Sequence, residues 1–256
     1  MKTGTLGKNN TLLKQIRRAI SQESLTADGL LAIEGPVLLT EALNCGVEIV
    51  NLFLSENTNY APPEGVPVIR LTPDLFHSIK STETAQGVIA LVRPPLFSLD
   101  ELINRNPNTI IVLCRVQDPG NAGTILRVAD AFGAACVATP GTVSIYNSKL
   151  IRASSGSIFR VPSCWDTRLE QLAPRLQSAG YSILGAHPEG SSDIKFYPWK
   201  QPVAILVGNE AGGLDEQEKA VCDAFLRIRH NEAVQSLNAA MATSIVLYEA
   251  TRSKFT

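Results

Sequence analysis

Between residues 30 and 92, short apolar runs alternate with stretches of helical periodicity. The apolar runs predict strands at residues 31–33, 49–54, 66–71 and 87–91. A helix is predicted over residues 36–43, because Pro36 suits a first helical position and Gly46 lies just past the end. A second, short helix is predicted to begin near Pro73. Together these elements predict a compact α/β unit.

In the second half of the chain, the apolar runs are continuous. They occupy residues 110–114, 136–139, 181–186 and 203–207, with helical stretches between them. Such runs are typical of parallel strands covered on both faces, so we expect a parallel sheet with right-handed crossovers. Prolines at positions 94, 95 and 107 indicate a linker. The predicted boundaries are therefore residues 1–94, a linker over 95–107, and residues 108–256.

Composition excludes several classes of protein. The 256 residues are 45% hydrophobic, with a net charge of -1 and a pI near 6.3. This balance argues against a protein that coats nucleic acid or anionic membranes nonspecifically. The start of the chain lacks the apolar stretch of a signal peptide, and no run approaches the roughly 20 apolar residues of a membrane span. We therefore expect a soluble, cytoplasmic protein without a membrane partner.

The cysteines lie far apart and show no paired spacing of metal ligands. Several fall inside apolar runs, so we expect reduced core residues and no metal site. The five are Cys45, Cys114, Cys136, Cys164 and Cys222.

The start of the chain is basic, and no acidic residue occurs before Glu23. Apolar residues recur at helical spacing over residues 12–20, which predicts a short helix with its cations mostly on the solvent side. Two interpretations stay open, a solvated helix face and contact with RNA phosphates. The cations are Lys2, Lys8, Lys14, Arg17 and Arg18, of which the last three are the candidate RNA contacts.

Three distant segments each combine a strand with a turn rich in Gly, Asn or Glu. They cover residues 110–133, 203–214 and 225–252. In the second, Gly208, Gly212 and Gly213 follow a buried run but lack the G-x-G-x-x-G spacing of a dinucleotide-binding fingerprint. A Rossmann dehydrogenase is therefore disfavoured.

Taken in this order, the three segments resemble the SpoU branch of the SPOUT RNA methyltransferases. The resemblance implies an S-adenosylmethionine-dependent RNA 2'-O-ribose methyltransferase, a homodimer, and a trefoil knot in the C-terminal domain. The first 94 residues resemble the L30e-like substrate-binding domain of many SpoU enzymes, which favours ribosomal over transfer RNA. The pairs Glu34-Gly35 and Gln86-Gly87 match that domain. We interpret both pairs as turn residues in preference to RNA contacts.

The resemblance also assigns candidate catalytic residues. Arg127 matches the principal catalytic arginine, and Asn121 the residue that supports it; a surface ion pair with Asp130 is the alternative for Arg127. Glu210 is interpreted as a brace for its loop or as a catalytic carboxylate. Asn238 is placed at the catalytic centre.

Further candidates bind the donor or the RNA. Ser236 has a second interpretation as the N-cap of the last helix. Arg152 is a candidate RNA contact, with a solvated helix position as the alternative. The helix after Ser236 is expected to pack across the dimer partner. The donor-binding candidates are Leu206, Gly208, Ile228, Ser236, Leu237 and Asn238.

The third segment departs from the family pattern. SpoU proteins usually carry Ile-Pro-Met and then a Gly two residues later, whereas this chain has Ile228, Arg229, His230 and Glu232. Charged and polar residues thus occupy a loop that is expected to wrap the methyl donor. A rival hypothesis follows, a noncatalytic RNA-binding homologue that has lost the donor.

The expected chemistry is an in-line displacement by the ribose 2'-oxygen on the sulfonium methyl group. Arginine holds its proton too tightly to act readily as a base. We therefore expect Arg127 to orient the substrate and to stabilise the developing oxyanion. Glu210 is a candidate proton acceptor.

Overall fold

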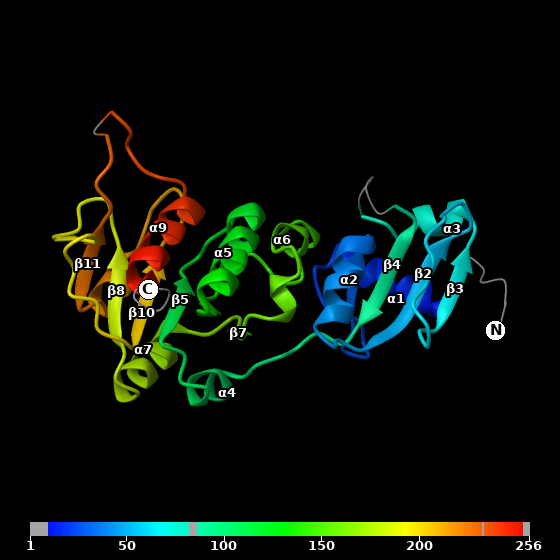
Figure 1. Ribbon diagram of the computed structural model, residues 1–256, viewed down its shortest axis with the longest axis horizontal. Helices are drawn as coiled ribbons and strands as arrows, with labels where there is room; N and C mark the ends of the chain where they lie inside the picture. The colour runs from blue at the N-terminus through cyan, green and yellow to red at the C-terminus, as the bar shows by residue number, and fades with distance from the viewer. Residues whose placement is uncertain (1–9, 82–85, 232, 253–256) are drawn as a thin grey trace. The chain divides into compact units, whose positions relative to one another are not determined.

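The computed structural model describes residues 10–81, 86–231 and 233–252. Two compact units divide the chain: Met1–Pro95 with Ser144–Phe159, and Leu96–Val143 with Arg160–Thr256 (Figure 1). The segment Ser144–Phe159 therefore packs in the first unit, although it follows the predicted linker in sequence.

The first unit is the predicted α/β unit, built on a mixed sheet of four strands among the described residues. The strand order is β1-β4-β2-β3, with β4 antiparallel to both neighbours and β2 parallel to β3. The strands are β1 Leu31–Glu34, β2 Ile49–Ser55, β3 Val68–Leu71 and β4 Val88–Val92. The helices are α1 Thr11–Ser21, α2 Pro36–Asn44, α3 Pro73–His77 and α6 Ser148–Ala153, with a 3-10 turn, η1, at Ser157–Phe159.

Strand β4 is buried on both faces because helices cover both sides of the sheet. Val88, Ala90 and Val92 face the core beneath α2, while Ile89 and Leu91 face the core beneath α1 and α3. Alternation of side chains along a strand produces this split. Segment 144–159 joins the unit because Ile151, Ile158 and Phe159 pack into the first of these cores.

Helix α1 is the basic helix predicted from the sequence. The Asn10 side chain caps it by accepting hydrogen bonds from the amides of Leu12 and Leu13. Its buried side contains Leu13, Ile16 and Ala19. The side chains of Lys14 and Arg18 are exposed and that of Arg17 is half-buried, whereas Lys2 and Lys8 lie outside the described residues.

The turn interpretation of residues 86–87 agrees with the local backbone. Gln86 and Gly87 have φ of 49° and 75°. A side chain on Gly87 would place a Cβ 2.7 Å from Cβ of Thr58, which is too close for any other residue.

The second unit contains a sheet with seven strands in the described part of the chain, all parallel as predicted. The strand order is β7-β6-β5-β10-β8-β11-β9. The trefoil knot that the family resemblance implies stays a prediction. The strands are β5 Thr109–Leu113, β6 Ala135–Ala138, β7 Ser163–Cys164, β8 Ser182–Ala186, β9 Ser192–Asp193, β10 Val203–Val207 and β11 Ala224–Arg227. The helices are α4 Leu99–Asn104, α5 Pro119–Phe132, α7 Leu169–Ser178, α8 Glu216–Ala220 and α9 Ala239–Thr251.

The segment predicted as a linker contains helix α4. Ser98 and Glu101 form a capping box at its start, a signal already present in the sequence. Leu102 is fully buried in the core of the second unit. Residues 96–107 of the predicted linker therefore belong to that unit.

Helix α5 begins at Pro119, directly after its capping residue. Asp118 is its N-cap and accepts from the amide of Asn121, so Pro119 and Gly120 form the first helical turn. Its buried face contains Ala122, Ile125, Leu126 and Ala129.

All five cysteines are free thiols, and Cys114 and Cys136 are fully buried. Burial raises the pKa of both thiols. Over the described residues, no helix is both long and apolar enough to span a membrane.

Candidate functional site

The loops at the carboxyl ends of β8, β10 and β11 enclose a pocket of about 560 Å³ in the second unit. Crevices at this edge of parallel sheets are the usual ligand sites of α/β proteins. The lining comes from four segments: residues 186–189, 207–213, 226–230 (Leu226, Ile228 and His230) and 236–242 (Ser236, Leu237, Asn238, Ala239 and Ala242).

The loop after β10 folds back on itself. Asn209 and Gly213 form a backbone bridge, and Asn209 Oδ1 accepts from the amides of Ala211 and Gly212. A Cβ on Gly208 would lie 2.2 Å from the carbonyl carbon of Gly213. The close backbone of Gly213 therefore requires glycine at position 208, whether or not a ligand also approaches this residue.

A hydrogen-bonded set joins the three segments singled out in the sequence. The Asn121 Nδ2 donates to Glu210 at 3.0 Å, and its Oδ1 accepts from Asn238 Nδ2 at 2.8 Å. The Glu210 carboxylate also accepts from the amides of Gln117 and Asp118, each at 3.2 Å. Residues from α5, the β10 loop and the start of α9 thus hold one another at the rim of the pocket.

These contacts set the ionisation of Glu210. Partial burial has the largest single effect and raises its pKa, but the hydrogen bonds from the Asn121 side chain and from the amides of Glu210 itself, Gln117 and Asp118 together outweigh burial. The net result is a pKa below the ordinary value for Glu. Glu210 is therefore an anion at neutral pH, with its oxygens engaged by the first motif.

Arg115 also connects separate segments of the site, and it was not identified from the sequence. Its guanidinium donates to the buried carboxylate of Glu218 at 2.9 and 2.7 Å and to the carbonyl of Gly213 at 3.3 Å. Its own carbonyl accepts from Asn209 Nδ2 at 2.9 Å. Arg115 adopts a φ of 57°, and the Glu218 hydrogen bond raises its pKa.

Asn238 has a structural role that the sequence analysis gave to Ser236. Helix α9 begins at Ala239, and Asn238 Oδ1 caps it by accepting from the amides of Ala240 and Met241. The N-cap interpretation of Ser236 is therefore wrong, because the helix starts two residues later than it requires. Ser236 is exposed and lines the pocket.

The remaining candidates for binding the methyl donor fall into two groups. Gly208, Ile228 and Leu237 line the pocket, as Asn238 does. Leu206 is fully buried in β10 and belongs to the core of the second unit.

Arg127 is exposed on α5 and is not among the residues that line the pocket of its own chain. Asp130, its alternative partner, has its Oδ2 within 2.7 Å of Arg160 Nε.

The altered third motif follows the end of β11 at Arg227, and its side chains differ in exposure. Ile228 and His230 line the pocket, whereas the Arg229 side chain is 77% exposed. Arg229 Nε lies 2.6 Å from Asp193 Oδ2. Glu232 lies outside the described residues.

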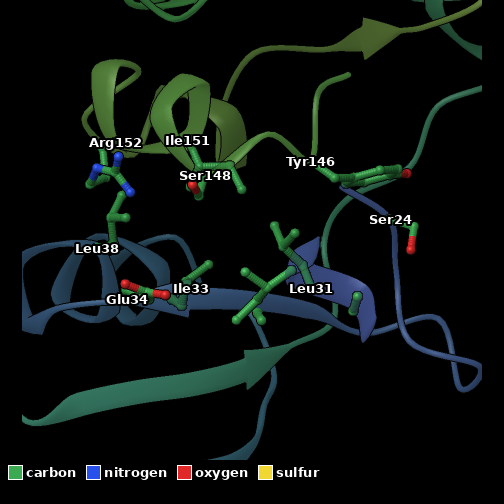
Figure 2. A pocket seen from close by; sticks show the side chains of 12 residues that line it. Ser24, Leu31, Ile33, Glu34, Leu38, Tyr146, Ser148, Ile151 and Arg152 are labelled. Carbon is green, nitrogen blue, oxygen red and sulfur yellow. The ribbon is translucent and has the colours of Figure 1, made fainter. Parts of the chain in front are cut away.

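The basic candidates of the first unit differ in exposure. Lys14 and Arg18 are exposed on α1, with Arg17 half-buried beside them. Arg152 lines a cavity of about 10 Å³, and Figure 2 shows its guanidinium directed toward Leu38 and Glu34. Within the described residues, the buried Arg152 Nη1 has no hydrogen-bond partner. The RNA contact of Arg152 stays a prediction.

An apolar strip on α9 lies open to solvent. Met241, Ile245 and Tyr248 are 63%, 39% and 56% exposed. Helix α9 packs beside α5 (Figure 1), and the rings of Tyr248 and Phe132 meet edge to face at 6.3 Å.

The sequence profile of the SpoU rRNA Methylase family matches residues 108–248. A 23S rRNA (uridine(2479)-2'-O)-methyltransferase of Streptomyces viridochromogenes is 33% identical over 193 residues, covering 73% of this chain and 67% of that protein. The 23S rRNA (guanosine(2553)-2'-O)-methyltransferase RlmP of Bacillus subtilis is 28% identical over 242 residues, or 93% and 95% of the two chains. The crystal structure of an AdoMet-bound rRNA methyltransferase from Sinorhizobium meliloti has a TM-score of 0.83 and 28% identity, covering 98% of this chain and 97% of that one. The family profile spans more than half of the sequence, and the chain belongs to the SpoU rRNA methylase family.

Proposed function

We propose that this protein is an S-adenosylmethionine-dependent methyltransferase that modifies the ribose 2'-oxygen of ribosomal RNA in the cytoplasm. The observation that carries the proposal is the hydrogen-bonded set of Asn121, Glu210 and Asn238 at the rim of the pocket. The Streptomyces and Bacillus relatives are 23S rRNA 2'-O-methyltransferases, and the Sinorhizobium relative is AdoMet-bound. These relatives favour ribosomal over transfer RNA.

The pocket fits the methyl donor in size and in lining. A volume of about 560 Å³ lies in the usual range for small-molecule sites. The backbone of residues 207–213, with Ile228 and Leu237, would hold the adenosine part, and Ser236 and Asn238 border it. When bound, the donor supplies a methyl group on a positively charged sulfur.

Catalysis then requires alignment of the ribose and stabilisation of charge on its 2'-oxygen. We assign Arg127 to orient the nucleotide and stabilise this oxygen, because guanidinium keeps its proton. Asn121 and Asn238 position the ribose, since each fixes the other through their hydrogen bond. The lowered pKa of Glu210 makes it a weaker base, so it braces Asn121, and the ribose proton goes to another group.

A homodimer would complete this site. Met241, Ile245 and Tyr248 form an exposed apolar strip that a second copy can bury. Arg127 is exposed on the adjacent helix α5 and does not line its own pocket. Pairing through α9 would bring Arg127 of one subunit near the site of the other, which fits the homodimer that the family resemblance implies.

The first unit would bind the RNA substrate through helix α1. Replacing Lys14, Arg17 and Arg18 by Gln should weaken RNA binding and reduce the slope of log affinity against log salt by up to about 2, at about 0.7 for each contact with a single-stranded phosphate. Affinity for the demethylated donor should stay unchanged. An unchanged salt slope would identify these residues as a solvated helix face.

The rival function, a noncatalytic RNA-binding homologue, predicts no donor binding. The alternation of Arg229 outward with Ile228 and His230 inward favours a pocket that is retained. Calorimetry with S-adenosylmethionine and its demethylated product should give a dissociation constant of roughly micromolar to submillimolar. Tritium transfer from labelled donor to ribosomal RNA tests the reaction itself. A folded protein that binds RNA but no donor at millimolar concentration would establish the rival function.

A further inference from the structure

Strands β9 and β11 form one edge of the second sheet, beside the donor pocket. They pair in parallel, and the amide of Ile194 extends the pairing by donating to the carbonyl of Arg227 at 3.1 Å. Lys195 and Phe196 follow at once, and the amide of Phe196 closes a turn onto the carbonyl of Asp193. We name Lys195, Phe196, Arg227 and Arg229 the edge patch.

Three cations gather in the edge patch. Arg227 and Arg229 are exposed and alternate with Ile228 and His230, which line the pocket, so the arginines lie on the outer side of the same segment. Asp193 holds two of these residues in place, because its carboxylate contacts Arg229 Nε at 2.6 Å and accepts a hydrogen bond from the amide of Lys195 at 2.9 Å. One carboxylate neutralises only part of this charge.

An aromatic ring stands among these cations. Phe196 is 74% exposed, and Lys195 Nζ lies 5.3 Å from the centre of its ring. An exposed ring beside Lys and Arg combines the two features by which proteins bind single-stranded nucleic acid, a stacking surface for a base and cations for its phosphates.

We propose that the edge patch binds a single-stranded segment of the RNA substrate, with a base stacked on Phe196 and phosphates held by Lys195, Arg227 and Arg229. The proposal rests on the proposed function only in naming ribosomal RNA as the source of that strand. RNA is favoured over a second copy of this chain, because two identical edge patches would bring like charges together. The position occupied by Pro in the family pattern carries an outward-facing RNA contact here, Arg229.

The test measures binding of fluorescein-labelled oligouridylate by fluorescence anisotropy, beside an abasic oligonucleotide of the same length. Phe196→Ala should weaken oligouridylate binding by about 5- to 150-fold. It should have little effect on the abasic strand, and Phe196→Trp should restore affinity. Arg229→Gln should weaken both strands and lower the salt slope by about 0.7. Arg175→Gln is the matched control, because Arg175 also pairs with an aspartate, Asp100, but on the last turn of α7.

Calorimetry with the demethylated donor separates this proposal from the proposed function. Donor affinity equal to wild type in both variants, with RNA binding weakened as stated, supports the edge patch. Methyl transfer by the wild type with unchanged RNA binding in both variants would overturn the edge patch and leave the enzyme assignment intact. A change in sedimentation of Phe196→Ala without a change in RNA affinity would also overturn it, since the surface would then contact protein.

Discussion

At the scale of single residues, the site depends on short polar side chains that each serve two motifs. Asn121 donates to Glu210 and accepts from Asn238, so its amide has one orientation in which both contacts form. Glu210 accepts only, which suits the three N–H groups directed at it. The family resemblance assigned these residues to one site. Which of them bond to one another is seen only in the folded chain, where Asn121 lies between Glu210 and Asn238.

We expect Glu210→Gln to lower stability in a pH-dependent way. The folded-state pKa of Glu210 is lowered, so its ionised form contributes stability that is fully present above its ordinary value of 4.5. That contribution is lost as the pH falls through the lowered pKa. The difference in melting temperature between wild type and variant should therefore be largest near neutral pH and shrink in acid. A difference independent of pH would show that the charge of Glu210 is not what the fold uses.

Arg127→Ala should leave folding intact, because the side chain is exposed. Methyl transfer should fall by at least about a hundredfold, the scale for losing one positioned charge in a transition state. Tritium incorporation into ribosomal RNA measures this effect, with Arg175→Gln as an exposed-arginine control. Turnover equal to wild type would remove Arg127 from the mechanism.

At the scale of elements, Arg115 and Glu218 tie the end of β5 to the β10 loop and to α8. Arg115→Met leaves the buried Glu218 carboxylate without this partner and should cost about 2 to 3 kcal/mol of unfolding free energy. Adding Glu218→Met should recover part of that loss, because the unpaired buried charge disappears. Urea denaturation measures both variants.

Donor binding separates the role of this pair in the loop from its role in stability. Arg115→Met should weaken binding of the demethylated methyl donor. The Gly213 carbonyl would lose its hydrogen bond from the Arg115 guanidinium, and the Asn209 side chain is held by the Arg115 carbonyl. Arg160→Gln breaks another ion pair of the same unit and should leave donor affinity unchanged. Equal donor affinity in both variants would limit Arg115 to stability.

The elements with strong periodicity were predictable, and the rest lacked a local signal. Strand β10 is apolar at every position, strand β5 is apolar at every position after Thr109, and both are buried throughout. Strands β7 and β9 are two residues long and mostly polar, and their pairing depends on neighbours distant in sequence. The Arg115–Glu218 pair spans 103 residues, so nothing in the local sequence indicated it. The capping box of α4 was a local signal, but the surrounding prolines favoured a linker.

At the scale of the whole molecule, the proposed homodimer would let one subunit supply Arg127 to the site of the other. The pocket lining and the set of Asn121, Glu210 and Asn238 come from one chain. Arg127 lies on α5 beside the exposed strip of α9, where a partner would pack. A site shared in this way makes subunit mixing informative.

Arg127→Ala and Asn238→Ala should each be inactive alone and should restore each other when mixed. In a mixed dimer, the Asn238→Ala subunit supplies an intact Arg127 to the intact pocket of its Arg127→Ala partner. Random exchange produces half mixed dimers with one working site each, so activity should approach about a quarter of the wild-type value. Unfolding and refolding the two variants together, followed by tritium transfer to ribosomal RNA, measures the recovery. Refolding each variant alone is the control. No recovery, with mixed dimers confirmed by differently tagged subunits, would place Arg127 and Asn238 of the same chain in one site.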